Sequence, residues 1–297
     1  MKVLEQENGD VLLVGAGGLS LPVHGAAPPF GIAGATAGAG AYYPGGGLPG
    51  VLMGGVDVTA QMQGGRIGAH AALRDADMPA FMAELDEFAF TLANRFDAQG
   101  LALFTDPAGA VPAGGGVPVQ AGYVGFSLTI QVSATVRAAP ALVRDGTHAV
   151  TGSPTGASAF TPNPSGGPEG FTGLIRRVLD FALGAEAQAG VAQVAPNVAG
   201  LGPDGSLAAP FAATATLADL ARDTVTAQVG GAATAAQRAD LELSVQTTLK
   251  ARYADATGVD TDAEMALMVQ LQAAYGANAR IIAATQSMFD TLLDMVR

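Results

Sequence analysis

The residues of this 297-residue chain that most suggest chemistry form a glycine-rich loop near its start. The run Val11–Val14 leads directly into Gly15–Gly18, and a strand that enters such a loop is typical of nucleotide-binding folds. Ser20 stands where a third glycine is required, no acidic residue follows before Asp57, and Pro22 prevents a helix from following the loop. We therefore predict a β-hairpin turn at Gly15–Gly18 and keep a nucleotide-binding enzyme as the alternative.

The other reactive side chains are scarce and scattered. The chain has no cysteine, which excludes disulfides, thiolate zinc sites and cysteine nucleophiles. His24, His70 and His148 lie in three different segments, and none has a second ligand at metal-binding spacing. The serines of the segment 152–170 lack the strand–turn–helix setting of a catalytic nucleophile. These residues predict no metal site, no cofactor and no catalytic activity.

Five acidic residues lie near the expected start of a helix and could in principle form a carboxylate acid/base pair: Asp75, Asp77, Glu84, Asp86 and Glu87. Negative charge stabilises a helix N-terminus, and the members within the helix lie on the side away from its apolar stripe. We predict that these carboxylates form a solvated helix face and take no part in catalysis.

Composition and charge exclude several further functions. The net charge of −12 argues against a phosphate-binding surface, so we predict no nucleic-acid partner. Only 13% of the residues are charged, and the 41 glycines and 17 prolines predict loosely structured parts. The uncharged stretch 11–56 is interrupted by prolines and glycines, so it cannot form a membrane-spanning helix. The acidic residues that follow Lys2 do not fit a cleavable secretory leader.

Two helices are expected ahead of the C-terminal region. Asp77 is predicted to cap a helix that has Pro79 in its first turn and an apolar stripe on one side. The stripe contains Met78, Phe81, Leu85, Phe88, Leu92 and Phe96. A second helix is predicted from Phe171 to a stop at Gly184.

The remaining sequence before residue 216 predicts short strands and loops. Near the start, Val3-Leu4 and the run 11–14 are expected to pair through a type I′ turn at Asn8-Gly9. The segment 123–136 is the best strand candidate of the middle region. The segment 152–170 is rich in Ser, Thr, Pro and Gly and is predicted to be a loop.

Two long helices are predicted to end the chain. The Thr-x-x-Asp pattern at 216–219 predicts a helix that continues to Gly258, with Gly230-Gly231 as a candidate bend. The Thr-x-x-Glu pattern at 261–264 is a better capping box and predicts a last helix, free of proline, that reaches Arg297.

The last helix carries an apolar seam with a strict seven-residue period. The seam follows a 3,4 alternation, and a second apolar column repeats every seven residues beside it. Two such columns can contact more than one neighbour, and an asparagine on the seam fixes register at a cost in stability. We therefore predict a coiled-coil assembly helix. The residues predicted to form the assembly interface are Met268, Leu271, Tyr275, Asn278, Ile281, Ile282, Met288, Phe289 and Leu292.

A set of residues in this last helix also forms a pattern shared with a known superfamily. These residues are Val259-Asp260, Glu264-Met265, Gln272, Tyr275, Ala277-Asn278-Ala279, Phe289-Asp290 and Leu292. The pattern resembles the C-terminal signature of the flagellar rod, hook and hook-associated axial proteins. The segment 64–96 resembles the hook-associated proteins of the hook–filament junction, which favours that family over a hook or rod protein, the alternative within the superfamily. The residues that carry this second resemblance are Gly65, Gly68, Arg74, Asp75, Leu85 and Asp86.

The resemblance implies a structural subunit of the bacterial flagellum at the hook–filament junction. It implies self-association in a helical or ring assembly, contacts with the hook protein and a neighbouring hook-associated protein, and an export chaperone as a candidate partner. It also implies an extracellular location, reached by the flagellar type III export route. Members of the family begin with a long amphipathic helix that carries the export signal, so a chain that begins MKVLEQENGD is expected to lack the N-terminal half.

Together these patterns predict an α+β fold: an elongated axial architecture with long C-terminal helices of coiled-coil type and a small β-rich, Gly/Pro-rich outer part. We expect a β-rich or loop segment of an outer domain at 1–63 and a helical segment of the middle domain at 64–100. An irregular β-rich insertion is expected at 101–170, a long-helix middle domain at 171–258 and the C-terminal axial coiled-coil helix at 259–297.

Overall fold

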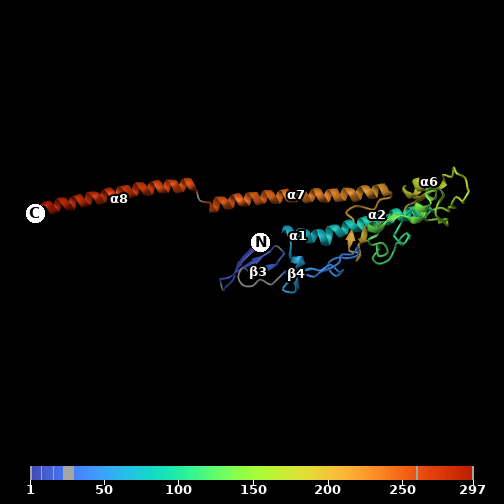
Figure 1. Cartoon of the computed structure of the whole chain (residues 1–297), viewed down its shortest axis with the longest axis horizontal. Coiled ribbons are helices and arrows are strands. Elements are labelled where there is room, and N and C mark those ends of the chain that lie inside the picture. Colours follow the sequence, from blue (N-terminus) through green and yellow to red (C-terminus); the bar gives the residue numbers. More distant parts are fainter. Residues whose placement is uncertain (1, 8, 16, 23–29, 259, 296–297) are drawn as a thin grey trace. The chain divides into compact units, whose positions relative to one another are not determined.

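The computed structural model describes residues 2–7, 9–15, 17–22, 30–258 and 260–295 (Figure 1). The described residues combine long helices with small sheets that are all antiparallel, which confirms the predicted α+β class. The chain divides into two compact units, residues 1–231 and 232–297, which are called unit 1 and unit 2 below.

Two three-stranded antiparallel sheets form the start of unit 1. The first has the strand order β1 (Lys2–Glu5), β2 (Val11–Val14) and β3 (Ser20–Pro22). The second has the order β4 (Phe30–Ile32), β5 (Val51–Met53) and β6 (Val56–Asp57), and the 3₁₀ turn η1 (Thr59–Gln61) follows it. The predicted pairing of Val3-Leu4 with the run 11–14 is confirmed. The type I′ turn predicted at Asn8-Gly9 includes Asn8, which lies outside the described residues.

The first long helical segment of unit 1 starts earlier than the sequence predicts. It contains α1 (Gly65–Ala72), the π-helical turn η2 (Leu73–Asp77) and α2 (Met78–Ala98). Asp77 has helical backbone angles and makes no side-chain cap, so the prediction that it starts a helix is wrong. Pro79 has no N–H to donate, and the π turn accommodates it by bonding the Met78 N–H to the Leu73 carbonyl, one residue further back than in an α-helix.

The middle of unit 1 consists of short elements joined by turns. It contains β7 (Phe104–Thr105), α3 (Phe126–Thr129), β8 (Gln131–Val132), α4 (Ala134–Ala138) and α5 (Leu142–Asp145). The prediction of a strand over 123–136 is therefore wrong. Gly125 adopts a left-handed conformation with φ 80°, and the N–H groups of Gly125 and Ser127 bond to the Asp86 carboxylate instead of a neighbouring strand. Contacts with α2 thus override the local strand propensity.

The segment 152–170 is a loop, as predicted: it contains neither helix nor strand, only the bridge between Val150 and Phe160. The predicted helix near Phe171 is confirmed as α6 (Gly173–Arg177) and the π turn η3 (Val178–Ala182). Two hairpins follow, formed by β9 (Glu186–Gln188) with β10 (Val191–Ala192) and by β11 (Ala199–Leu201) with β12 (Leu207–Ala208).

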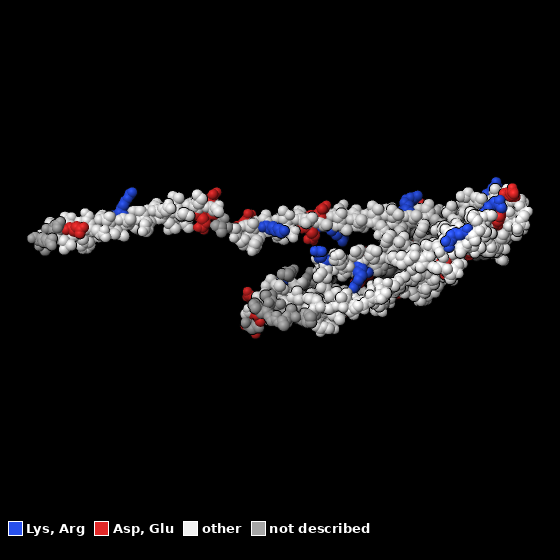
Figure 2. Space-filling model, in the orientation of Figure 1, with Lys and Arg blue, Asp and Glu red and all other residues white. Residues whose placement is uncertain are grey.

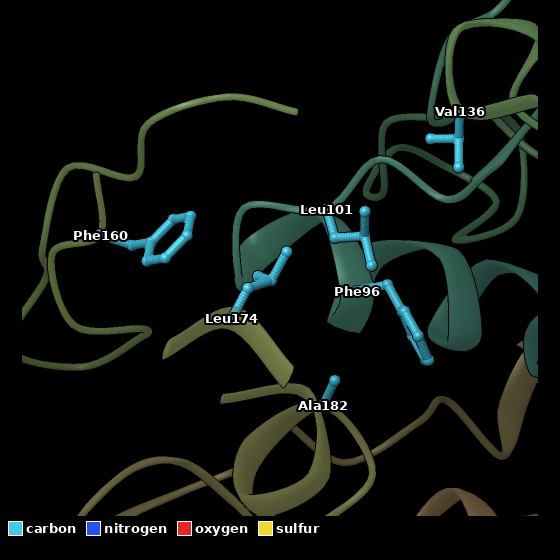
Figure 3. Close-up of a cluster of buried hydrophobic side chains, with 6 residues drawn as sticks. All are labelled: Phe96, Leu101, Val136, Phe160, Leu174 and Ala182. Carbon is cyan, nitrogen blue, oxygen red and sulfur yellow. The ribbon is translucent and has the colours of Figure 1, made fainter. Parts of the chain in front are cut away.

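Two small apolar clusters form the core of unit 1. The first joins the end of α2 to α4, α6 and η3 and contains Phe96, Leu101, Val136, Phe160, Leu174 and Ala182 (Figure 3). The second contains Ala89, Ala93, Tyr123 and Phe126. Both clusters use α2, so this helix is the central support of the unit.

The two predicted C-terminal helices are both present. α7 (Leu217–Thr257) runs without interruption through Gly230-Gly231, and α8 (Thr261–Met295) follows it. Leu217, Leu220 and Thr224 are the buried residues of α7. Unit 2 contains the rest of α7 together with α8.

Candidate assembly surface and its anchor

An aspartate caps the N-terminus of α8. Asp260 Oδ1 accepts hydrogen bonds from the N–H groups of Asp262 (3.0 Å) and Ala263 (3.1 Å). The Asp260 carbonyl oxygen accepts a bond from the N–H of Glu264 (2.9 Å). The prediction that Thr261 caps this helix is therefore wrong by one residue. A carboxylate accepts these bonds and also adds negative charge where the helix dipole is positive, which favours Asp260.

We expect Asp260→Ala to destabilise the first turn of α8 by about 1 kcal/mol, because two backbone N–H groups lose their acceptor. Amide hydrogen exchange of residues 261–265 in the full chain should become about fivefold faster. Thr261→Ala is the matched control and should leave these rates unchanged. Equal acceleration in both variants would mean that the threonine contributes the cap.

The nine residues predicted to form the assembly interface all lie exposed on α8. The eight apolar ones range from 52% exposed at Leu292 to 79% at Tyr275. Arg280 is the single charged residue between Met265 and Phe289, and Figure 2 shows a white surface along this stretch apart from one blue patch. Covering a large apolar side chain gains about 1.5–3 kcal/mol, so this surface favours association. That these residues bind a neighbour stays a prediction.

α7 begins with a threonine cap, as predicted from the pattern at 216–219. The N–H of Asp219 donates to Thr216 Oγ1 (3.1 Å), and that hydroxyl donates to Asp219 Oδ2 (2.7 Å). The hydroxyl bond, together with Arg222, holds the pKa of Asp219 below its ordinary value. Leu217 and Leu220 in the next turn are buried, so the helix is fixed to unit 1 at its start.

Arg95, in the last turn of α2, connects three other segments of unit 1. Its Nη1 donates to the carbonyl oxygens of Ala215 (2.8 Å) and Gly184 (3.5 Å), and its Nη2 donates to that of Val194 (3.3 Å). The residue is 5% exposed, and burial lowers the pKa of its guanidinium. The sequence analysis missed Arg95 because its partners lie 89 to 120 residues away along the chain.

Three of the five acidic residues predicted to be solvated are in fact buried. Glu84, Asp86 and Glu87 are each 3% exposed, so the prediction of a solvated helix face is wrong for them. Asp77 is exposed, and Asp75 is half-buried beside Arg74. The buried carboxylates face donors that distant loops bring to α2, and no local pattern announces those donors.

Asp86 and Glu87 together hold two loops against α2. Asp86 accepts the N–H of Gly125 (2.6 Å) at Oδ2 and that of Ser127 (2.9 Å) at Oδ1, which also accepts the Ser127 hydroxyl. Glu87 Oε1 accepts the backbone N–H of Asn197 (2.7 Å) and its side-chain amide (3.2 Å). Glu87 therefore contacts two residues, Tyr123 and Asn197, that lie 74 residues apart in the chain.

Tyr123 and Gln120 complete this polar network. Tyr123 donates its hydroxyl to Glu87 Oε2 (2.7 Å), and its ring stacks on Phe90 at a centroid distance of 3.9 Å. Burial and the Glu87 carboxylate raise the pKa of Tyr123. Gln120 donates to the carbonyl oxygen of Ala83 (2.8 Å) and accepts the N–H of Gly202 (2.6 Å). Both carboxylates are occupied by donors of the protein itself, which suits a structural role.

Glu84 is held by a longer hydrogen bond than the other two buried acids, Asp86 and Glu87. Gln228 of α7 donates to Glu84 Oε2 at 3.4 Å, and burial raises the pKa of the carboxyl. A carboxyl with a higher pKa in the folded state stabilises the fold when protonated, and it opposes folding once the pH rises through that pKa.

We therefore expect Glu84→Gln to raise the Tm of unit 1 by a few degrees at pH 7, because it removes a buried charge and keeps a hydrogen-bonding group. The difference should disappear below about pH 4, where the unfolded carboxyl is also protonated. Thermal unfolding of the full chain at both pH values measures this. Glu242→Gln, at an exposed position of α7, should change neither Tm. A lower Tm for Glu84→Gln at pH 7 would contradict the expectation.

Four residues of the 64–96 pattern lie in α1 and η2, which lead into α2. Gly65 has a positive φ of 63°, which favours glycine. A Cβ added to Gly68 would lie 2.5 Å from the Met62 carbonyl oxygen, so a larger residue does not fit there. Arg74 pairs with the Asp75 carboxylate and donates to the carbonyl oxygen of Pro49 (3.0 Å), which ties η2 to the segment before β5.

Gly15, Gly17 and Gly18 lie between the paired strands β2 and β3, as predicted, and Ala16 lies outside the described residues. The Gly15 N–H donates to the Leu19 carbonyl (2.8 Å), the Gly18 N–H donates to that of Gly15 (3.1 Å), and Gly18 has a φ of 85°. β2 and β3 pair antiparallel across these glycines. A phosphate-binding loop leads from a strand into a helix N-terminus, whereas the next described element here is a strand. The geometry gives no support to the nucleotide-binding alternative.

The histidines do not come together in the described part of the chain. His24 lies outside it, His70 lies in α1, and His148 follows α5 with its Nε2 3.7 Å from Asp97 Oδ1. Within residues 2–7, 9–15, 17–22, 30–258 and 260–295, no three His, Asp or Glu side chains are grouped so that they could hold a metal ion. No described helix has the length and apolar character needed to cross a bilayer.

Residues 251–295 match the family described as flagellar basal body rod FlgEFG protein C-terminal. The matched range covers the last residues of α7 and all of α8, so it coincides with the exposed seam. The match supports a structural, axial protein of the flagellum that assembles into a multi-subunit structure. No curated protein and no solved structure matches the chain significantly.

Proposed function

We propose that this chain is a structural subunit of the bacterial flagellum at the hook–filament junction, and that it assembles through the apolar seam of α8. The observation that carries the proposal is the coincidence of two features on one helix. In the segment that matches the flagellar family, the nine residues of the predicted interface are exposed, and the eight apolar ones among them are more than half exposed. A helix of this kind gains its stability from tertiary or intersubunit packing.

The position at the junction rests on the segment 64–96. Gly65 and Gly68 of that segment lie in α1, and the Arg74-Asp75 pair lies in η2, so these pattern residues fall on one helical segment that leads into α2. Its partners in this proposal are further copies of itself, the hook protein, a neighbouring hook-associated protein and an export chaperone. Its location is extracellular, after export by the flagellar type III route.

A rod or hook protein is the second candidate, because the description of the matched family names the flagellar basal body rod. Immunogold electron microscopy of flagella from cells that express a tagged chain distinguishes the two. The exposed loop position between Ser165 and Gly166 accepts an epitope without disturbing a helix or strand. Gold at the boundary between hook and filament supports the proposal, and gold on the rod or along the hook supports the second candidate. A chain absent from purified flagella would contradict both, and untagged cells are the control.

A further inference from the structure

Arg95 is a buried cation without a buried anion beside it. Its three hydrogen bonds all go to backbone carbonyls, those of Gly184, Val194 and Ala215. Among the described residues, no carboxylate lies within ion-pair distance of its guanidinium. Burial therefore disfavours the charged form and lowers its pKa. A structure selected for stability alone gains little from such a residue, since apolar side chains fill a core at lower cost.

The location of Arg95 beside the start of α7 adds a second, electrostatic cost to that of its burial. Ala215 immediately precedes Thr216, the cap of α7, and the N-terminus of a helix repels cations. The dipole of α2 offsets part of this cost, because Arg95 lies in the last turn of α2. The planar guanidinium fork can bind three carbonyls that arrive from different directions, which a lysine ammonium on a flexible stem cannot do with the same geometry. Arg95 therefore fixes the arrangement of the three segments that carry Gly184, Val194 and Ala215.

A second polar contact lies further along the same pair of helices. Glu84 is eleven residues before Arg95 on α2, which places both side chains on one face of the helix. Glu84 accepts from Gln228, thirteen residues after Ala215. We call residues 215–228 the α7 root. Leu217, Leu220 and Thr224 are buried between the two contacts. The α7 root therefore has one strong polar contact at its start and one weaker contact at its end.

We propose that Arg95 is a positioning residue for assembly, whose guanidinium fixes the direction of the α7 root against α2. α7 continues as one helix to Thr257, so it carries the first residues of the flagellar family match at its far end. The assembly part of this inference rests on the proposed function. The geometric part concerns unit 1 alone.

Distances between two spin labels in the full chain test the geometric part. The chain has no cysteine, so cysteines introduced at the exposed positions Ala76 and Val229 take up the labels specifically. Val229 is roughly 21 Å of helix from Ala215, so a tilt of about 20° at the start of α7 moves its label by roughly 7 Å. We expect one narrow distance distribution in the parent chain. In Arg95→Lys the distribution should be at least twice as wide.

Arg177→Lys is the matched control. Arg177 is also partly buried and bonds to Ser158, through Oγ (2.7 Å) and the carbonyl oxygen (2.9 Å), and burial also lowers its pKa. It makes no hydrogen bond to α7, so its replacement should leave the distribution narrow. Amide exchange at Leu101 and Phe160 reports whether the core stays folded, because their N–H groups donate to the carbonyl oxygens of Phe96 and Val150 and both side chains are buried in the first core cluster. Arg95→Lys should leave this protection within about twofold of the parent value.

Three results overturn the inference. A distribution that stays narrow in Arg95→Lys removes the positioning role, and so does equal broadening in Arg177→Lys. Loss of protection at Leu101 and Phe160 in Arg95→Lys would make the arginine a general core residue instead. If Arg95→Lys broadens the distance distribution but the full chain keeps the self-association affinity of the parent, the assembly part is overturned and the geometric part stands. Failure of the proposed function is recognised separately, because α8 would then not mediate assembly even in the parent chain.

Discussion

Replacing Glu87 by alanine is expected to lower the free energy of unfolding of unit 1 by about 3 kcal/mol or more. The change removes the acceptor of the Asn197 backbone N–H and of the Tyr123 hydroxyl, and both groups are held in the interior by this carboxylate. A buried donor without a partner costs about 1–3 kcal/mol, and more when the lost partner is charged. With a typical stability of about 5–15 kcal/mol for a whole domain, this loss is a large fraction of the total.

Urea unfolding of the full chain, followed by the fluorescence of its tyrosines, measures this loss. The chain has no tryptophan and five tyrosines, and Tyr123, at 2% exposed, is the buried one, so its environment changes most on unfolding. Asp77→Ala is the matched control, because Asp77 is an exposed acid on the same helical segment. Its effect should stay within about 0.5 kcal/mol. Equal stability of the Glu87→Ala chain and the parent would mean that the buried carboxylate holds neither loop.

Glu87→Gln separates the role of charge from the role of shape. The amide oxygen can still accept from Asn197, but its NH₂ group faces the Tyr123 hydroxyl and the Gln120 amide, which donate to Glu87 in the parent chain. The tyrosine hydroxyl can turn and accept, whereas the Gln120 amide loses one of its two acceptors and keeps the Ala83 carbonyl oxygen. We expect a loss that is smaller than that of Glu87→Ala.

Local signals in the sequence predict those parts of the fold that depend on local interactions. The sequence predicts the starts of α7 and α8 to within one residue, because a cap and the helix that it caps are neighbours in the chain. The hairpin at Gly15–Gly18 is likewise predictable, since its turn hydrogen bonds join residues at most four positions apart. The heptad pattern of α8 identifies which side chains share a face.

The candidate site is only half predictable for the same physical reason. The seam on α8 follows from periodicity, but the anchor of α7 depends on Arg95 and Glu84, whose partners lie 89 to 144 residues away. Glu87 lies on the polar side of its helix and looks solvated until the loops that carry Tyr123 and Asn197 are placed. Its burial is decided by tertiary contacts, and a single sequence without those contacts assigns it to the surface.

Charge on the seam of α8 is expected to weaken self-association by about a thousandfold. Ile282 and Phe289 are seven residues apart on the seam and are 58% and 63% exposed. The double variant Ile282→Asp/Phe289→Asp removes two large apolar contacts worth about 1.5–3 kcal/mol each. Burial of the new carboxylates adds to that loss. A total loss of at least about 4 kcal/mol corresponds to the thousandfold change. Sedimentation velocity of the full chain over a range of concentrations measures it.

The matched control places the same two charges on the opposite face of the same helix. Gly276 and Ala283 are also seven residues apart and exposed, and at 100° per residue each lies 100° or more around the helix from Ile281, Ile282, Met288 and Phe289. Gly276→Asp/Ala283→Asp has the same net charge and a comparable cost in helix propensity, because glycine is a poorer helix former than aspartate and alanine a better one, so it should reduce the affinity by less than about tenfold. A parent chain that stays monomeric at every concentration, or equal weakening by both double variants, would show that the seam is not the surface through which copies of this chain meet.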